Sequence, residues 1–348
     1  RIYMKKIVIN GKFLTQRITG VQRYAREIVA QLDQLVSAEQ MEIAVPLDAN
    51  EIPEYKNIKI SKIGQLRGQL WEQVSLPLYA KKHEALLLNL CNVSPLFKPD
   101  IVCIHDVKIN ARPHDFSKKF LLWYSILFKN AAKKAKAIIT VSEFSKSEII
   151  KYYTVEANRI HVIPNAWQHY QLVGYDAHCL EKYNLKKDSY YFAMSSLEPN
   201  KNFKWIAQAA VKNPEDTFAV AGSINEKIFQ DGLGFEVPAN MKLLGYVSDE
   251  EAKTLMRDCK AFLFPSYYEG FGIPPLEAIS AGTKQVVVSD IPVMHELFGE
   301  EAVYVSPEEY NVCLKDCIHA NGQVSNKVLD TYSWKKSAQE LMNVLNGL

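Results

Sequence analysis

Two glutamates, Glu269 and Glu277, stand in the stretch of this sequence whose residues point most clearly to chemistry. The stretch is PSYYEGFGIPPLEAISAG, residues 265–282, and it follows the apolar run KAFLF at 260–264. An apolar run, then two glycines and two prolines, then LEAISA predicts a strand, a tight turn and a helix. Such a turn lets a ligand approach the backbone, and a helix start suits a phosphate. Both glutamates could accept hydrogen bonds from hydroxyls there. The alternative is that Glu277 only complements the helix dipole and Glu269 is solvated.

Length and composition favour a two-domain globular protein. The 348 residues are 48% hydrophobic and 23% charged, which is enough to bury a full core. A net charge of +2 gives no argument for a nucleic-acid partner, and no apolar run reaches membrane-spanning length. The six cysteines are scattered, so we expect reduced thiols in the cytoplasm. Cys313 and Cys317 lack a second ligand pair and are better explained as core residues than as a metal site.

Strands and helices alternate along the chain, which predicts two doubly wound parallel sheets of the α/β class. In the first half we expect strands at 5–10, 42–47, 85–90, 100–106, 136–142 and 160–166. In the second half we expect them at 189–196, 217–223, 241–247, 260–266, 284–290 and 302–307. Helical spacing is found at 21–36, 202–213, 249–259 and 333–348. The first loop lacks a strict G-x-G-x-x-G, so a dinucleotide fingerprint is not supported.

The polar residues 168–187 carry no periodic apolar pattern, so they are predicted to be the linker. The expected domains are 4–170, a Rossmann-like N-terminal domain, and 171–330, a Rossmann-like C-terminal domain. We expect a cleft at the carboxyl ends of their strands.

Further strand ends carry residues suited to a ligand. Lys201 in SSLEPNKNF (195–203) could place a cation against a phosphate, and Ser248 or Asp249 could cap a helix beside Val247. In the first half, His105 ends a strand in the motif IHD, and Gly20 lies in the first loop. The alternatives are a solvated Lys201 and a structural His105. The convergence of several such turns on one sheet edge predicts a phosphate-binding cleft.

The motif E-G-F-G-I-P-P-L-E resembles the E-x7-E motif of the retaining GT-B glycosyltransferases of family 4, which use sugar nucleotides. The similarity covers nearly the whole chain. It extends to SLEPNKN (196–202), LLGYVSDEE (243–251), FPSYYEGFGIPPLEAISAG (264–282), HELFGEEAVYVSP (295–307), TGVQRYAREI (19–28), LWEQVSLP (70–77), IHDV (104–107), TVSEFSKSEI (140–149) and VIPNA (162–166).

This resemblance implies a role for each candidate residue. Glu277 should bind the ribose hydroxyls, Glu269 the hydroxyls of the transferred sugar, and Lys201 the diphosphate. His105 should contact the donor sugar as a positioning donor near the reacting centre. The remaining donor-binding residues act through the backbone or through lack of a side chain: Gly20 at the diphosphate, Val247 at the base, and Phe271, Gly272 and Ile273 at the sugar and phosphate.

The resemblance also implies the reaction. A hexose or deoxyhexose of the mannose, rhamnose or glucose type would move with retention from a nucleotide-diphosphate sugar to a glycan acceptor in surface polysaccharide assembly. No cofactor and no metal are expected, because S-D-E-E at 248–251 is better explained as a helix cap than as a metal site. The helix at 331–348 should cross back to the N-terminal domain. Charge developing on the leaving diphosphate would be stabilised by fixed N–H groups and Lys201.

One departure from the family leaves an alternative open. Many members carry an arginine near position 195 or at position 200, where this chain has Ser195 and Asn200. Helix starts, or Arg17 in the first loop, would have to stabilise the diphosphate instead. A non-catalytic sugar-nucleotide-binding subunit is therefore the alternative function. Another GT-B enzyme, such as a sugar-nucleotide epimerase or a phosphorylase, is less favoured, since its motifs are missing.

The acceptor side is less specific. FSKKFLLWYSILFKNAAKKAKA (116–137) places aromatic and apolar residues between lysine clusters. Such a segment could rest on an anionic membrane near a lipid-linked glycan, but an ordinary core helix with basic ends is the favoured interpretation. We expect a cytoplasmic protein, with peripheral contact at the inner face of the membrane as the open alternative.

Overall fold

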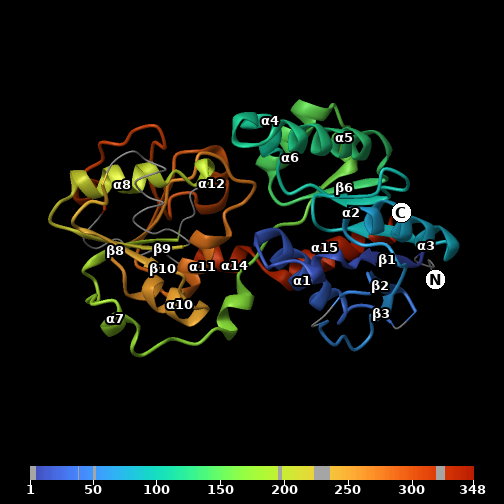
Figure 1. Ribbon diagram of the computed structural model, residues 1–348, viewed down its shortest axis with the longest axis horizontal. Coiled ribbons are helices and arrows are strands. Elements are labelled where there is room, and N and C mark those ends of the chain that lie inside the picture. The colour runs from blue at the N-terminus through green and yellow to red at the C-terminus, as the bar shows by residue number, and fades with distance from the viewer. Residues whose placement is uncertain (1–4, 38, 50–51, 195–197, 223–235, 319–325) are drawn as a thin grey trace. The chain divides into compact units, whose positions relative to one another are not determined.

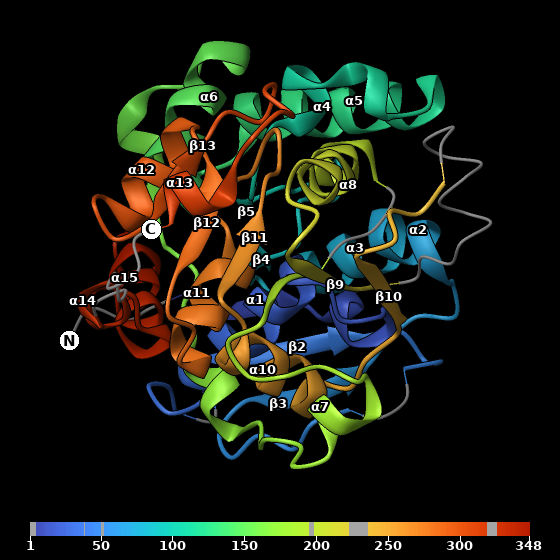
Figure 2. The ribbon, with the colours of Figure 1, turned by 90° about the vertical axis from the view of Figure 1, so that its left-hand side faces the viewer.

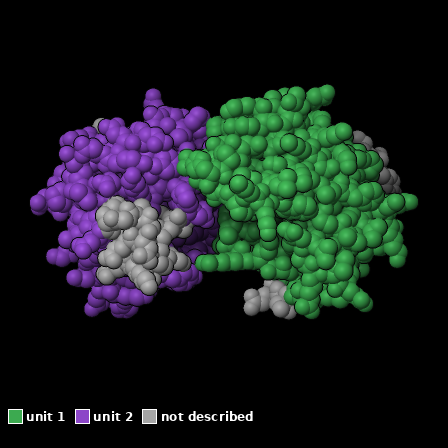
Figure 3. All heavy atoms as spheres, turned by 45° about the horizontal axis from the view of Figure 1, so that its top comes forward, with its two compact units in different colours: residues 1–165, 332–348 green, residues 166–331 purple. Residues whose placement is uncertain are grey.

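The computed structural model describes residues 5–37, 39–49, 52–194, 198–222, 236–318 and 326–348. The chain divides into two compact units, which Figures 1 and 3 show. Unit 1 comprises residues 1–165 and 332–348, and unit 2 comprises residues 166–331.

Unit 1 is built on a seven-stranded parallel sheet in the order β3-β2-β1-β4-β5-β6-β7. Its strands are β1 (Ile7–Asn10), β2 (Met41–Val45), β3 (Lys59–Lys62), β4 (Leu86–Asn89), β5 (Ile101–Cys103), β6 (Ala137–Thr140) and β7 (Ile160–Val162). The chain builds outward from β1 in one direction and from β4 in the other. The loops after these two strands therefore diverge, and such a switch point is where open α/β sheets bind ligands.

Helices cover both faces of this sheet (Figure 1). They are α1 (Gly20–Leu32), α2 (Gly68–Leu70), α3 (Leu76–Lys82), α4 (Lys108–Ala111), α5 (Lys118–Lys134), α6 (Glu143–Tyr153) and α15 (Trp334–Asn346), with short turns η1 (Gly11–Thr15), η2 (Trp71–Ser75), η3 (Pro113–Asp115) and η4 (Ala157–Arg159). Phe128 of α5 and Ile149 of α6 pack on Ile138 of the sheet. The sheet is thus buried by helices, as its near-continuous apolar strands require.

The C-terminal helix α15 belongs to unit 1, where it packs against α1. The rings of Tyr24 and Trp334 lie edge to face with centroids 5.9 Å apart. The hydroxyl of Ser337 donates to the carbonyl of Pro164 at 2.8 Å. These contacts bring the last helix back to the first.

Unit 2 contains a six-stranded parallel sheet in the order β10-β9-β8-β11-β12-β13. Its strands are β8 (Tyr190–Met194), β9 (Thr217–Ala221), β10 (Met241–Gly245), β11 (Ala261–Phe264), β12 (Val286–Ser289) and β13 (Val303–Val305). The switch point of this sheet lies between β8 and β11, which pair directly. The loops that follow these two strands are the ones that carry Lys201 and Glu269.

The helices of unit 2 also lie on both faces of the sheet, as Figures 1 and 2 show. They are α7 (Cys179–Lys182), α8 (Phe203–Lys212), α10 (Asp249–Asp258), α11 (Ile273–Ala281), α12 (Pro292–Phe298), α13 (Leu314–Cys317) and α14 (Lys327–Thr331), with turns η5 (Gln168–Leu172) and η6 (Pro199–Lys201). Trp205 and Ile206 of α8 pack against alternate strand residues such as Tyr191, Phe218 and Leu263. This alternation follows from the two-residue period of a strand.

All twelve predicted strands are confirmed where the structure describes them, and most of their ends lie within two residues of the predicted ones. Ser195 and Ser196, at the end of the predicted strand 189–196, lie outside the described residues, as does Ser223. The strand β3 was not predicted. Its sequence KISK is short, lysine-rich and only partly buried at the edge of the sheet, so it lacks an apolar run.

The prediction that residues 168–187 form a linker is wrong. This segment belongs to unit 2 and contains η5 and α7, with His169, Tyr170 and Cys179 buried. A few buried contacts at irregular spacing hold it in place, and such contacts give no periodic signal.

Candidate active site

The loops after β8 and β11 are tied together by two buried asparagines. The Asn200 amide donates to the Tyr268 carbonyl at 2.7 Å, and the Tyr267 N–H donates to the Asn200 carbonyl at 2.9 Å. The Asn202 amide donates to the carbonyls of Pro265 and Pro307 at 2.9 and 2.8 Å. Both side chains are about 2% exposed. The switch point of unit 2 is therefore a rigid edge on which side chains can be held in fixed positions.

Lys201 and Glu269, the two residues predicted to act on the diphosphate and the sugar, contact each other across this edge. The Lys201 Nζ lies 2.8 Å from Glu269 Oε1. The Lys201 side chain is 30% exposed and the Glu269 side chain 15% exposed. The same ammonium lies 5.4 Å from the centre of the Phe264 ring. A cation and a carboxylate thus stand side by side at the place where a parallel sheet binds ligands.

The start of α11 contains Gly272 and Ile273, two of the three residues whose backbone is predicted to meet the sugar and phosphate. Gly272 is the N-cap residue with φ 127°, and Ile273 begins the helix. Pro274 and Pro275 have no N–H, so the unpaired donors of a helix start are confined to Gly272 and Ile273. The Phe271 side chain is buried beneath them. The helix start can therefore present a narrow pair of N–H groups and a positive dipole end to an anion.

Replacing Gly272 by alanine is expected to destabilise the protein by about 1 to 3 kcal/mol, mainly through backbone strain. A Cβ at this position would lie 2.8 Å from Met294 Cε, and the φ of 127° disfavours any L side chain. Urea unfolding checks the effect. Gly174→Ala is the matched control, since nothing lies within 4 Å of its added Cβ. Equal unfolding midpoints for the two variants would show that the turn is not strained.

Glu277 lies further along α11 and is held by a histidine that the sequence analysis did not identify. The Nε2 of His169, from η5, lies 2.8 Å from Glu277 Oε1. The Glu277 side chain keeps 19% of its surface exposed, whereas that of His169 keeps 5%. One carboxylate oxygen is thus engaged inside the unit. No sequence signal pointed to His169, since 108 residues separate the two partners.

The loop after β10 leads from Val247, the residue predicted to contact the base, into the capped start of α10. Ser248 caps α10 and forms a capping box with Glu251, which confirms the predicted helix cap. Val247 is 7% exposed, just before the cap. The Gly222 N–H donates to the Gly245 carbonyl at 2.8 Å, which joins the loops after β9 and β10. Within the described parts of the chain, no group of three or more acidic, histidine or cysteine residues could hold a metal ion.

In unit 1, His105 is a buried, neutral histidine after β5. Its Nε2 lies 2.8 Å from the carbonyl oxygen of Leu90, so Nε2 carries the proton and donates it. The ring lies edge to face against Tyr24. Burial lowers the pKa of His105 to about 4, and the bond to Leu90 opposes this shift. Because Nε2 already donates to Leu90, the neutral ring offers a sugar hydroxyl only the lone pair of Nδ1, and the expected contact of His105 with the donor sugar stays a prediction.

The lowered pKa of His105 predicts a pH dependence of stability. The unfolded chain takes up a proton near pH 6.5, whereas the folded chain does so only near pH 4. At roughly 1.4 kcal/mol per pKa unit, the folded state loses about 3 kcal/mol relative to the unfolded state as the pH falls from 6.5 to 4. Urea unfolding at several pH values should show a smaller loss for His105→Gln, whose amide can still donate to Leu90. The control is His178→Gln at an exposed position. A pH profile of H105Q identical to that of the wild type would contradict the account.

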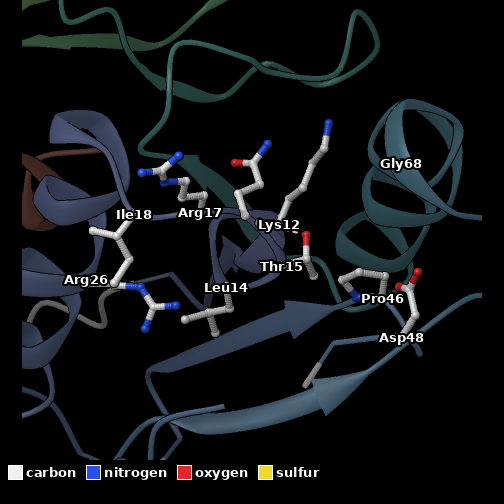
Figure 4. A pocket seen from close by; sticks show the side chains of 10 residues that line it. Lys12, Leu14, Thr15, Arg17, Ile18, Arg26, Pro46, Asp48 and Gly68 are labelled. Carbon is white, nitrogen blue, oxygen red and sulfur yellow. Dashed lines mark hydrogen bonds between the residues drawn. The ribbon is translucent and has the colours of Figure 1, made fainter. Parts of the chain in front are cut away.

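The first loop of unit 1 borders a cavity of about 560 Å³ at the carboxyl ends of β1, β2 and β3. Figure 4 shows Arg17 and Lys12 extending to one side of this loop and Arg26 to the other. Lys12 is paired with the buried Glu72 at 2.6 Å. Gly20 is the exposed first residue of α1, after a capping box between Thr19 and Gln22. Arg17 thus borders a cavity of unit 1, and its expected role at a diphosphate stays a prediction.

Two parallel-sheet units, each with helices on both faces of its sheet, are the architecture of the GT-B class of proteins. Two family descriptions match the chain: "Glycosyltransferase Family 4" over residues 18–167 and "Glycosyl transferases group 1" over residues 180–312. The chain belongs to glycosyltransferase family 4 and has the GT-B fold.

Particular relatives agree with this assignment. The chain is 26% identical to the O-antigen chain mannosyltransferase RfbU of Salmonella typhimurium and 27% identical to the O-antigen chain mannosyltransferase B of Escherichia coli. Each alignment covers 87% of this chain and 87% of the relative. The fold is similar to that of HepE from Anabaena in complex with UDP and glucose. Their TM-score is 0.72 at 17% identity, covering 99% of this chain and 100% of HepE.

Proposed function

We propose that this glycosyltransferase moves mannose from GDP-mannose, with retention of anomeric configuration, to a lipid-linked glycan in surface polysaccharide assembly. The named activity of the two O-antigen mannosyltransferases supports the sugar and the pathway class. The UDP complex of HepE supports a nucleotide-diphosphate donor. The observation that carries the proposal is the placement of Lys201, Glu269 and Glu277 at one sheet edge, beside the start of α11.

In this mechanism the negative charge that develops on the leaving diphosphate is stabilised by positive groups that the fold holds in place before the reaction. The N–H groups of Gly272 and Ile273 and the Lys201 ammonium supply the positive potential. Glu269 accepts from hydroxyls of the transferred sugar, and the held carboxylate of Glu277 accepts from the ribose. The acceptor hydroxyl attacks the anomeric carbon from the face of the leaving diphosphate. The bond from that carbon to the phosphate oxygen breaks, the diphosphate takes the hydroxyl proton, and the configuration is retained. Metal-free catalysis is part of the proposal.

Asn200, at a position where the family resemblance implies an arginine in some members, has a structural role in this chain. Its amide is used to fix the loop that carries Glu269, because it bonds the Tyr268 carbonyl at 2.7 Å. The site thus has a rigid loop in place of a second cation. A non-catalytic sugar-nucleotide-binding subunit remains the rival function. The reason is that a single lysine, itself paired with Glu269, is assigned to the diphosphate.

The surface of unit 1 supports a lipid-linked acceptor. The predicted core helix is confirmed in part: Leu127 and Phe128 of α5 are buried, whereas Leu122 is 65% exposed and Ile126 42% exposed. Leu70, Val74 and Leu78 are also exposed, four residues apart along α2, η2 and α3. Exposed lysines lie at both ends of α5, namely Lys118, Lys119, Lys133 and Lys134. Apolar side chains rimmed by lysines suit the surface of an anionic bilayer.

The membrane part of the proposal has its own test. No helix among the described residues is long and apolar enough to cross a bilayer. We expect the protein to sediment with vesicles that contain anionic lipid, and Leu122→Glu to weaken this binding about tenfold or more, because it puts a charge in the contact surface. Val211→Glu, at an exposed apolar position of unit 2, is the matched control. Equal sedimentation of the two variants would remove α5 from the contact.

The donor part of the proposal is tested by thermal stabilisation with GDP, UDP and dTDP and their sugars in the presence of a chelator. A ligand that binds only the native state raises the unfolding midpoint. GDP and GDP-mannose should raise it most, and Glu277→Ala should remove most of the shift. If only UDP or dTDP raises the unfolding midpoint, the donor sugar is carried by that nucleotide and not by GDP. If no nucleotide gives a shift, the assigned donor site is wrong.

A further inference from the structure

The short polar segment that contains His169 is fixed against the two helices α10 and α11. Lys253 of α10 is 5% exposed, and its ammonium donates to the carbonyls of Tyr170 and Val173 at 2.8 and 2.6 Å. The Tyr175 hydroxyl donates to the Ala281 carbonyl, at the end of α11, at 3.1 Å. On the other side of His169, the Trp167 indole N–H donates to the Leu329 carbonyl at 2.9 Å, so the imidazole has a defined position.

The contact between His169 and Glu277 has a defined direction. An ionised carboxylate only accepts hydrogen bonds, so Nε2 of His169 is the donor to Oε1 at 2.8 Å. A glutamate side chain has three rotatable bonds, and ordering them on ligand binding costs free energy. In this protein the buried imidazole has ordered the carboxylate beforehand. Oε2 and the second lone pair of Oε1 are left to accept from two neighbouring hydroxyls.

We propose that His169 is a positioning residue that holds Glu277 ready for the two ribose hydroxyls and so sets the preference of the site for ribonucleotides over deoxyribonucleotides. The inference rests on the proposed donor site and adds to it the residue that makes Glu277 selective. A purely structural His169 would satisfy a half-buried carboxylate and have no effect on the sugar of the nucleotide. The two roles predict different ratios between the affinity for a ribonucleotide and the affinity for a deoxyribonucleotide. A general loss of stability does not change this ratio.

The test is calorimetric titration of GDP, 2′-deoxy-GDP and 2′,3′-dideoxy-GDP into the wild type, His169→Ala and His169→Gln. The wild type should prefer GDP over the dideoxy nucleotide by about ten- to a hundredfold, the range of hydrogen bonds to a charged group. H169A should reduce this ratio to about threefold or less while the affinity for dideoxy-GDP stays within about twofold, since only hydroxyl contacts are lost. H169Q should restore most of the ratio, because its amide nitrogen lies where Nε2 lies.

A second variant and a control distinguish the positioning of Glu277 by Nε2 from a nonspecific effect of replacing a histidine. His169→Asn places an amide nitrogen near Nδ1 instead of Nε2, so the ratio should fall although a polar group is present. His178→Ala, at a side chain that is 88% exposed, should change nothing. If H169A or H169N keeps the ratio of the wild type, or weakens all three nucleotides equally, His169 does not position Glu277. In that case GDP binding by the wild type would still uphold the donor site, whereas a wild type that binds none of the three nucleotides would overturn both proposals.

Discussion

Replacing Lys201 by methionine should lower kcat by about two to three orders of magnitude, the loss found when one preorganised donor to a developing anion is removed. Lys201 is the cation that stands at the switch point between β8 and β11, 2.8 Å from Glu269. Position 200 carries an asparagine that is committed to the loop, so no neighbouring arginine stands there to substitute for it. Initial rates of GDP release from GDP-mannose measure the effect.

Two further variants separate charge from packing at this position. Lys201→Arg keeps the cation and should retain much more activity than K201M. Lys204→Met changes a lysine of α8 that is exposed and lies over the Tyr310 ring, and it should leave kcat nearly unchanged. A folded K201M enzyme with kcat within about threefold of the wild type would show that the leaving diphosphate is stabilised elsewhere, contrary to the electrostatic argument.

Glu269→Gln should impair the use of the sugar nucleotide without weakening the binding of the free nucleotide. The amide keeps the shape of the side chain but loses the acceptor charge, so kcat/KM for GDP-mannose should fall by about a hundredfold, as expected when a charged hydrogen bond to a sugar hydroxyl is lost. The affinity for GDP should stay equal or rise, because the Lys201 ammonium no longer shares its charge with a carboxylate 2.8 Å away.

Two measurements separate the effect on the sugar from an effect on the nucleotide. Calorimetry gives the affinity for GDP, and steady-state rates give kcat/KM for the donor. The exposed Glu308→Gln is the matched control within unit 2 and should alter neither quantity. If E269Q weakens GDP and GDP-mannose by the same factor, Glu269 acts on the nucleotide or on the fold, and its assignment to the transferred sugar is wrong.

The fold could be predicted from the sequence because the strands of a parallel sheet are buried on both faces. Runs such as KAFLF and TFAVA stand out from polar loops, and their regular alternation with helices permits few topologies. The edge strand β3 was not predicted, because an edge strand needs no apolar run. Residues 168–187 were misassigned for a related reason, since the buried side chains of His169 and Tyr170 contact α11 and α10 instead of forming a stripe of their own.

The types of the site residues could be predicted, but their partners could not. Lys201, Glu269 and Glu277 stand at strand ends and helix starts that the sequence marks. Long-range contacts decide what each can do. The Leu90 carbonyl fixes the tautomer of His105, and His169 holds Glu277. The Asn200 amide donates to the Tyr268 carbonyl. The partners in these pairs are 15, 108 and 68 residues apart, and no local sequence pattern predicts such contacts.

The central claim is that this chain transfers a sugar from a nucleotide diphosphate with retention, and turnover of GDP-mannose followed by NMR in the presence of a chelator tests it most directly. The account predicts that GDP is released, that the sugar product first formed has the α configuration of the donor, and that Glu277→Ala abolishes the release. A product first formed with the β configuration would contradict retention. No release of GDP from a protein that binds GDP in calorimetry would contradict catalysis and establish the non-catalytic sugar-nucleotide-binding subunit in its place.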